Sequence, residues 1–230
     1  MNFKVIASVS FVIAFVLNTT AVKAQTDYKM GLIFGSNYSS LRSDLFTTSS
    51  GRLSATAGFS ILLGFGQNFE LNTEIAFAQK GAIAKTVQYN PENKPSIRSY
   101  EFFYNSFEAG VFAGYQPFET VPVRLQAGGF FGTNFHQLDR THRDMYVSDY
   151  DNIVNATQVT LLNEAFSGLD FGPALGISAG SGRFNVSARY YLGARNMYKN
   201  IPFATENHKI YSSTIRVALT YYFKDRSTFN

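Results

Sequence analysis

Residues 53–78 are LSATAGFSILLGFGQNFELNTEIAFA. In the two halves of this stretch, separated by the Gly- and Asn-containing residues 64–68, mostly apolar side chains occupy every second position. The positions between them are largely small or polar and include Glu70 and Glu74. A period of two is that of a β-strand whose two faces differ, and Gly with Asn is a turn signal. The stretch therefore predicts a β-hairpin with one apolar and one polar face.

The same alternation recurs in six further segments, so that eight strands are predicted in all. These segments are residues 28–35, 106–115, 123–132, 169–178, 183–192 and 211–223. No stretch after the N-terminal region has 18 consecutive apolar residues, which argues against a membrane-spanning helix. The chain is therefore predicted to be all-β.

The segments between these strands alternate between short and long. The short ones, with Gly, Pro or Asn, are 64–68, 117–122 and 180–182, and the long polar ones are 37–52, 82–98, 137–165 and 194–209. An even strand number with short turns at one rim and long loops at the other is the pattern of outer-membrane barrels. The short turns are then expected to face the periplasm and the long loops the cell exterior.

The polarity of the two strand faces distinguishes a membrane barrel from a soluble barrel of the lipocalin kind. One face is almost entirely Leu, Val, Ile, Phe, Ala and Tyr. The other face holds nearly all strand charges: Lys29, Glu70, Glu74, Glu108, Arg124, Asp170, Arg183, Arg189 and Arg216. A charge at a lipid-facing midplane position costs roughly 2–4 kcal/mol, so the charged face is predicted to point inward. The prediction is an eight-stranded antiparallel transmembrane up-and-down β-barrel.

The N-terminal region has the layout of an export signal. Residues 1–24 carry Lys4, then an apolar run, then small or β-branched side chains at the −3 and −1 positions of a cleavage site before Gln25. The apolar run is shorter than the roughly 20 residues that a spanning helix needs. We therefore expect 1–24 to be a cleaved signal peptide and 25–230 to be the barrel domain, located in the bacterial outer membrane.

Composition agrees with export and excludes several functions. The chain has no Cys, 23 Phe and 14 Tyr, so disulfides, thiolate metal sites and a lipoprotein anchor are impossible. The net charge of +4 falls to +2 without 1–24, because that segment contains Lys4 and Lys23 and no acid. So small an excess, without a basic run, gives no reason to expect nucleic acid as a partner.

Four short motifs resemble the PorT-like outer-membrane β-barrels of Bacteroidota. They are LNTEIAFAQKG at 71–81, DFGPALG at 170–176, ARYYLGARN at 188–196 and the aromatic strand end YYF at 221–223. The resemblance covers the mature chain at the level of strand order, and it implies the barrel fold. It also implies a possible role as an accessory component of a type IX-like secretion system. The chain departs from the pattern in having Glu108-Ala109-Gly110 where a Pro is usual, and in continuing for seven residues after Phe223.

The inward charges are the candidate functional residues. The predicted lumen network comprises Glu74, Glu108, Arg124, Asp170, Arg189 and Arg216. By depth, Glu74 and Glu108 are expected to face Arg189 and Arg216 near the middle, with Arg124 and Asp170 toward opposite ends. The interior of an eight-stranded barrel is just wide enough to be filled by side chains. A structural plug is therefore the first interpretation, and a narrow gated pore or proton path is the second.

Catalysis and metal binding have weaker support. Candidate catalytic groups gather in or near the segment 137–165: His136, His142, Asp139, Asp144, Asp149 and Asp151. The chain has no Gly-x-Ser-x-Gly elbow, His-Glu-x-x-His helix or EF-hand spacing. We therefore predict no catalytic residue, metal site or cofactor, and keep an outer-rim lipid or peptide hydrolase only as an alternative.

Binding is the remaining class of function. Segments 82–98 and 137–165 mix apolar and aromatic residues with charges, as recognition loops on a rigid scaffold do. The sequence thus predicts a non-enzymatic outer-membrane barrel that serves as a structural or surface-interaction platform. Expected partners are outer-membrane lipids, the barrel-assembly machinery during insertion, and secretion-system or surface proteins reached through these two segments.

Overall fold

The computed structural model describes most of the predicted barrel. The described residues are 27–43, 48–65, 68–89, 95–118, 120–139, 146–147, 160–161, 168–197 and 209–223. The predicted signal peptide, 1–24, lies outside them. Within these ranges, no helix is long and apolar enough to cross a membrane.

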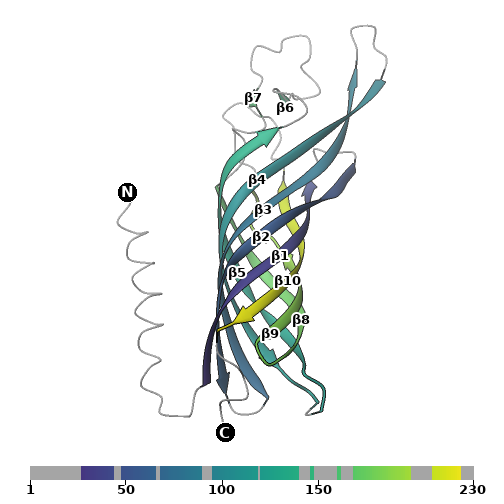
Figure 1. Ribbon diagram of the computed structural model, residues 1–230. Coiled ribbons are helices and arrows are strands. Elements are labelled where there is room, and N and C mark those ends of the chain that lie inside the picture. Colours follow the sequence, from purple (N-terminus) through teal and green to yellow (C-terminus); the bar gives the residue numbers. More distant parts are fainter. Residues whose placement is uncertain are drawn as a thin grey trace.

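Eight antiparallel strands close into a barrel, which confirms the predicted fold (Figure 1). They are β1 (Asp27–Ser43), β2 (Thr48–Phe65), β3 (Phe69–Tyr89), β4 (Pro95–Tyr115), β5 (Val123–Asp139), β8 (Leu169–Ser181), β9 (Phe184–Leu192) and β10 (Ile210–Tyr222). Around the wall they follow the order β1-β10-β9-β8-β5-β4-β3-β2. A separate two-stranded ladder joins β6 (Tyr146–Val147) to β7 (Thr160–Leu161) inside the predicted loop 137–165.

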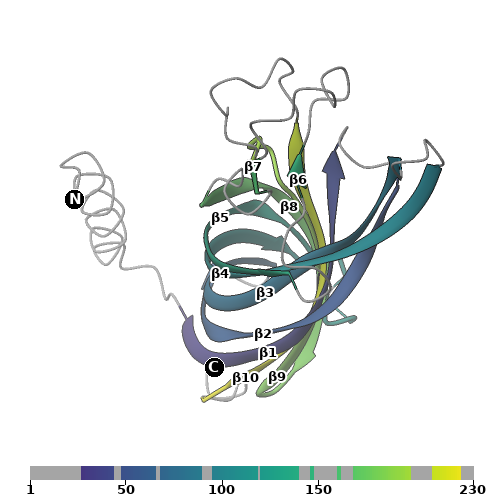
Figure 2. The ribbon, with the colours of Figure 1, turned by 90° about the horizontal axis from the view of Figure 1, so that it is seen from above.

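The barrel is closed by the pairing of its first and last strands. The register runs from Gly31 opposite Tyr222 to Ser43 opposite Ile210. Figure 2, seen from above, shows β10 lying beside β1 in the wall. A closed barrel has no strand edge along its lipid-facing wall, so its backbone groups bond within the wall.

Along the strands, exposed and buried side chains alternate, as the sequence pattern predicts. Along β4, for example, Val111 is 49% exposed and Phe112 is 1% exposed. Outward aromatic rings pair between neighbouring strands near both ends of the apolar face: Phe69 with Tyr115 at 5.0 Å between ring centroids, and Phe107 with Phe135 at 5.0 Å. Aromatic residues are enriched at the two interfaces of a membrane, where an amphipathic ring suits both environments.

We call the two rims the turn end and the loop end. The turn end carries the β2–β3, β4–β5 and β8–β9 connections, and the loop end carries the other four. At the turn end, Ser181 pairs with Phe184 across a two-residue connection, and Gly182 there has φ 60°. Glycine adopts this left-handed conformation without steric cost, which explains why the chain can reverse so tightly.

Two of the predicted loops are wrong, because they are mostly strand. The prediction placed loops at 37–52 and 82–98, yet β1 continues to Ser43 and β2 begins at Thr48. Likewise β3 continues to Tyr89 and β4 begins at Pro95, and this hairpin rises above the rest of the wall (Figure 1). Backbone pairing needs no apolar side chains, so the ladder extends beyond the part of each strand that lipid covers.

Above the apolar band, β1 and β3 interact across a gap in the β2–β3 ladder. The register of that ladder shifts between Gly51 and Thr56. There the Ser39 hydroxyl of β1 accepts a hydrogen bond from the Gly81 amide at 2.7 Å and donates to the Gly81 carbonyl at 2.9 Å. The Asn37 amide nitrogen donates to the Gln79 carbonyl at 3.0 Å. Side chains of β1 thus satisfy backbone groups of β3 that the bulged strand no longer pairs.

The closed wall predicts heat-modifiable gel mobility. The protein extracted from outer membranes with detergent should stay folded in cold SDS and shift its mobility only after boiling, because unfolding must break a continuous ladder. Gel electrophoresis with and without boiling checks this. Recovery of the mature protein as a soluble periplasmic monomer would contradict the fold.

The strand extension predicts a sharp boundary for insertions. An epitope inserted at 44–47, between β1 and β2, should be labelled on intact cells. The same epitope placed between Gly182 and Arg183 should be labelled only after the outer membrane is permeabilised. An insertion after Ser39 should abolish the heat-modifiable band, because it breaks the bonds to Gly81. Labelling of the Gly182 insertion on intact cells would invert the orientation, and a folded Ser39 insertion would contradict the extension.

Candidate functional site inside the barrel

Among the side chains that the structure describes, nine charged ones lie on the inward faces, in the lumen. Each is at most 5% exposed: Lys29, Lys80, Arg124, Arg189 and Arg216 with Glu70, Glu74, Glu108 and Asp170. All six residues of the predicted network are among them. Five cations and four carboxylates nearly cancel, as buried charges must in order to offset the cost of leaving water.

At the turn end, Arg124 of β5 joins Glu70 of β3. The distance from Arg124 Nε to Glu70 Oε2 is 2.9 Å. Arg124 Nη2 also donates to Gln116 Oε1 at 2.6 Å, and Gln126 Nε2 donates to Glu70 Oε1 at 3.4 Å. Arg124 is therefore held by an ion pair and a hydrogen bond, and Glu70 is linked through Gln126 to the next layer.

In the middle of the barrel, Arg189 of β9 joins Glu74 of β3. Arg189 Nη1 donates to Glu74 Oε1 at 2.7 Å, and Arg189 Nε donates to Gln126 Oε1 at 2.7 Å. Asn72 Nδ2 donates to Glu74 Oε1 at 2.9 Å, and Asn72 Oδ1 accepts from Ser60 Oγ at 2.7 Å. The carboxylate and the guanidinium thus both have partners besides each other.

Nearer the loop end, Glu108 of β4 lies between two cations. It forms ion pairs with Lys80 and with Arg216. Arg216 Nε donates to Asn37 Oδ1 at 2.8 Å, which ties β10 to the bonded β1–β3 region. Lys80 Nζ also lies 3.6 Å from Asp170 Oδ2, and the same oxygen accepts from Ser212 Oγ at 2.6 Å.

Both central ion pairs cross the full width of the lumen. In the strand order, β3 and β9 are four places apart in a ring of eight, and so are β4 and β10. Glu74–Arg189 and Glu108–Arg216 therefore each join diametrically opposite strands. Two side chains that meet across the lumen leave no room for a central column of water at that level, because the interior of such a barrel is just wide enough to be filled by side chains.

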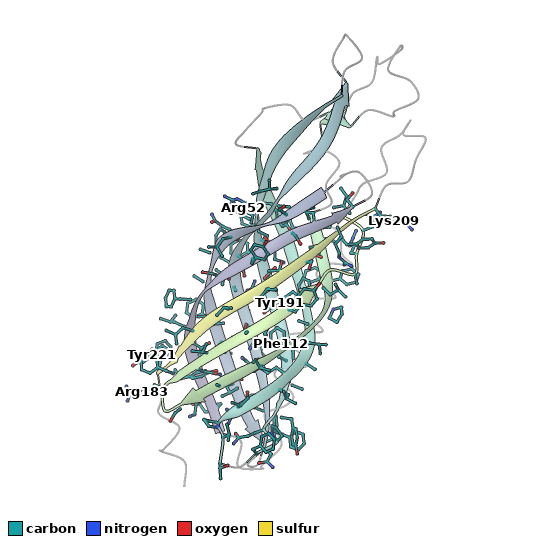
Figure 3. All side chains as sticks on the ribbon, turned by 90° about the vertical axis from the view of Figure 1, so that its right-hand side faces the viewer. Arg52, Phe112, Arg183, Tyr191, Lys209 and Tyr221 are labelled. Carbon is teal, nitrogen blue, oxygen red and sulfur yellow. The ribbon has the colours of Figure 1, made fainter. Side chains whose placement is uncertain are left out.

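Three aromatic rings fill the space beside these pairs. Tyr191 packs edge-on against Phe130, with centroids 5.3 Å apart, and against Phe112, with centroids 6.0 Å apart. Tyr191 and Phe112 lie in the middle of the barrel in Figure 3. Two lumen cations lie over these rings. The guanidinium carbon of Arg189 is 4.2 Å from the Phe112 ring centroid, and that of Arg216 is 4.7 Å from the Tyr191 ring centroid. Such cation–π contacts stabilise a cation that has lost its water.

Tyr191 also forms a hydrogen bond with one of the two central ion pairs. Arg216 Nη1 donates to the Tyr191 hydroxyl at 3.4 Å. Lys80 Nζ, at the next level, lies 5.0 Å from the Phe130 centroid. The cavities found beside these groups hold no more than about one water molecule each, and one is lined by Glu74, Glu108 and Arg216. Beside these groups the lumen therefore has room for single water molecules and not for a column of water.

Glycine makes room for the long side chains at one position in particular. Gly176 of β8 is the cross-strand neighbour of Arg189. A methyl group at Gly176 would lie 2.6 Å from Arg189 Cγ and 2.8 Å from its Cα. The glycine therefore clears the path that the arginine stem takes into the lumen.

One residue that was predicted to lie in the lumen is exposed, and one charged residue of the lumen was not predicted. Arg183 is exposed at the β8–β9 turn, where its Nη1 donates to the Tyr221 hydroxyl at 3.3 Å. It belongs to the two-residue turn and so does not follow the strand parity. Lys80 was missed because it lies beyond the apolar part of β3, although it shares the parity of Glu70 and Glu74. Tyr191, Phe112 and Phe130 share the strand parity of the inward charges, and all three are buried.

The candidate catalytic groups lie in or beside the predicted loop 137–165. His136 and Asp139 fall at the end of the β5 backbone. The others, His142, Asp144, Asp149 and Asp151, lie outside the described residues. Within the described part of the chain, no group of three His, Cys, Asp or Glu side chains could hold a metal ion.

An apolar outer wall, aromatic belts and a charged, packed lumen define an integral outer-membrane β-barrel. The chain belongs to the family described as "Outer membrane protein beta-barrel domain", whose model matches residues 23–199. Its location is accordingly the bacterial outer membrane.

Solved outer-membrane barrels have a similar fold. Neisserial surface protein A is 11% identical, with 84% of this chain and 97% of that chain covered and a TM-score of 0.47. Ail of Yersinia pestis is 10% identical (86% and 99% covered, TM-score 0.42), and OprG of Pseudomonas aeruginosa is 10% identical (86% and 95%, TM-score 0.40). A comparison with curated proteins gives no match.

The position of Glu108 between two cations predicts a large stability effect. Glu108→Gln should lower the free energy of unfolding by about 3–5 kcal/mol, because Lys80 and Arg216 keep their charges without this carboxylate. A urea titration of the protein in detergent, followed by circular dichroism, measures the change. Arg183→Gln, which removes an exposed charge, is the matched control and should differ little from wild type.

A double variant tests whether the effect comes from the charge. Lys80→Met combined with Glu108→Gln removes one cation and one carboxylate together. It should be less destabilised than the sum of the two single variants, because neither partner is left unpaired by the other's loss. Strict additivity, or a Glu108→Gln variant as stable as wild type, would contradict the buried pair.

Proposed function

We propose that this protein is a non-enzymatic outer-membrane barrel that acts as a structural or surface-interaction platform, with a lumen closed by its own side chains. The observation that carries this proposal is the pair of ion pairs that cross the lumen, Glu74–Arg189 and Glu108–Arg216. A conducting pore needs a continuous path of water, and these pairs lie across that path. The ring cluster of Phe112, Phe130 and Tyr191 occupies the space beside them.

The packing also argues against the pore interpretation on energetic grounds. Opening a water path would require separating a guanidinium from a carboxylate and from an aromatic face at the same level. Each such contact is stronger in a dry interior than in water, so the closed arrangement is self-reinforcing. A plugged barrel contributes a rigid wall and its exposed rims, rather than a passage.

The platform role is supported by the loop end. The β3–β4 hairpin is built of two 21-residue strands, and it pairs from Phe69 opposite Tyr115 to Tyr89 opposite Pro95. Much of the predicted loop 82–98 is instead a paired extension of this hairpin, which rises above the wall (Figure 1). A preformed element needs less ordering when a partner binds, which favours recognition at this rim. Secretion-system or other surface proteins are the partners we propose for it.

Planar-bilayer recording tests the plug directly. The purified wild-type protein should show little or no steady conductance. Glu108→Gln and Arg189→Gln should produce flickering openings, because each leaves a crossing pair broken and the plug loosened. Arg183→Gln, outside the lumen, should behave as wild type. A large stable wild-type conductance that Glu108→Gln leaves unchanged would mean that these charges line a wet channel, and transport would replace the structural role.

A further inference from the structure

The exposed charges that the structure describes are all positive, whereas the lumen holds charges of both signs. Among residues whose side chains the structure describes, all four carboxylates are buried in the lumen. The five basic side chains that are at least partly exposed are Arg42, Arg52, Arg183, Arg195 and Lys209. Arg52 and Lys209 lie at the loop end and Arg183 at the turn end in Figure 3. The described outer surface is thus cationic at its rims and uncharged between them.

The outward column of β10 places two of these cations at a definite depth. From the loop end it runs Lys209, Tyr211, Ser213, then the aliphatic Ile215, Val217 and Leu219, then Tyr221. Tyr221 comes ten residues after Tyr211 in the chain. At about 3.3 Å per residue and a strand tilt of about 35–45°, they lie about 25 Å apart along the membrane normal. That is the height of the apolar band of such barrels, so Tyr211 marks its outer edge.

Arg42 lies at the same outer edge, on the neighbouring strand. It is the cross-strand partner of Tyr211 and, like Tyr38 below it, points outward from β1. Its guanidinium carbon lies 5.7 Å from the centre of the Tyr211 ring, and its Nη2 donates to the Gly193 carbonyl at 3.3 Å. The side chain is held in place and is still exposed. Lys209, also exposed, lies two residues farther out in the same column as Tyr211.

We propose that Arg42 and Lys209 form a binding site for a phosphate group of an outer-leaflet lipid, an anionic phosphorylated glycolipid of the lipid A type. A guanidinium offers paired N–H donors that match phosphate oxygens, and an ammonium adds a mobile point charge. The Tyr211 ring lies between the headgroup level and the acyl chains, where an amphipathic ring is most stable. The aliphatic column below it would contact the acyl chains of the same lipid.

The chain offers a matched control for this site. Arg183 is also an exposed arginine beside an outward tyrosine, since it donates to the Tyr221 hydroxyl at 3.3 Å. It lies at the opposite, turn end of the barrel. The two rims therefore each have an arginine beside a tyrosine. Comparing variants at the two rims distinguishes binding at a specific site in the outer leaflet from general attraction of an anionic lipid.

The experiment titrates the full mature chain in a neutral detergent with diphosphoryl lipid A and follows the complex by native mass spectrometry. We expect saturable binding of one lipid and at least tenfold weaker binding of the same lipid without its phosphates. Arg42→Gln/Lys209→Gln should bind diphosphoryl lipid A on the order of tenfold more weakly than wild type, since each cation near a phosphate contributes severalfold. Arg183→Gln should bind as wild type. All variants are first shown to keep the heat-modifiable band.

Three outcomes would overturn the proposal. One is wild-type affinity in the folded Arg42→Gln/Lys209→Gln variant, and another is an equal loss in Arg183→Gln, which would indicate non-specific attraction. The third is displacement of the lipid by inorganic phosphate at a concentration equal to that of the lipid, which would assign the site to free phosphate. A preference for the phosphorylated lipid that only the Arg42 and Lys209 substitutions remove would establish the site.

Discussion

Two ion pairs across a barrel of this width impose conditions on everything around them. Glu74 and Arg189 meet only if β3 and β9 stand at the right heights, and Glu108 meets Arg216 only if β4 and β10 do. Each isolated charge would be strongly destabilising in a dry interior, so a slip of one register step would leave both partners without compensation. The pairs therefore constrain the stagger of strands that are not neighbours, which the backbone ladder alone cannot do.

The wall is adapted to those pairs. Gly176 gives Arg189 room to leave the sheet, and Asn37 connects Arg216 to the region where β1 bonds to the β3 backbone. The rings of Phe112, Phe130 and Tyr191 take the volume that the charged side chains do not fill. Because every arginine at the centre has both a carboxylate and a ring beside it, no single substitution removes all the partners of another charge.

Much of this could be predicted from the sequence, because the period of two is a local property. Which face of β3 carries Glu70 and Glu74 follows from parity alone, and the same holds for Arg189 and Arg216. Parity failed at Arg183, which lies in a turn. At Lys80 and Ser39 parity holds, but the apolar residues that marked the strand had ended, so the strand was predicted too short. The detailed partners depend on how the sheet closes. That Lys80 shares Glu108 with Arg216 requires the stagger of the whole ring, which no local pattern contains.

The chain order of the paired charges bears on how the barrel assembles. In the lumen, β1 to β4 contribute Glu70, Glu74 and Glu108 against two lysines, whereas β5 to β10 contribute three arginines against Asp170. An N-terminal half-sheet therefore holds surplus negative charge, and the C-terminal half holds surplus positive charge. Glu74 and Glu108 cannot meet Arg189 and Arg216 until the last hairpin, β9–β10, arrives, and contacts so distant in sequence form late and slowly. We therefore expect the two ion pairs that cross the lumen to form in the same step that closes the wall.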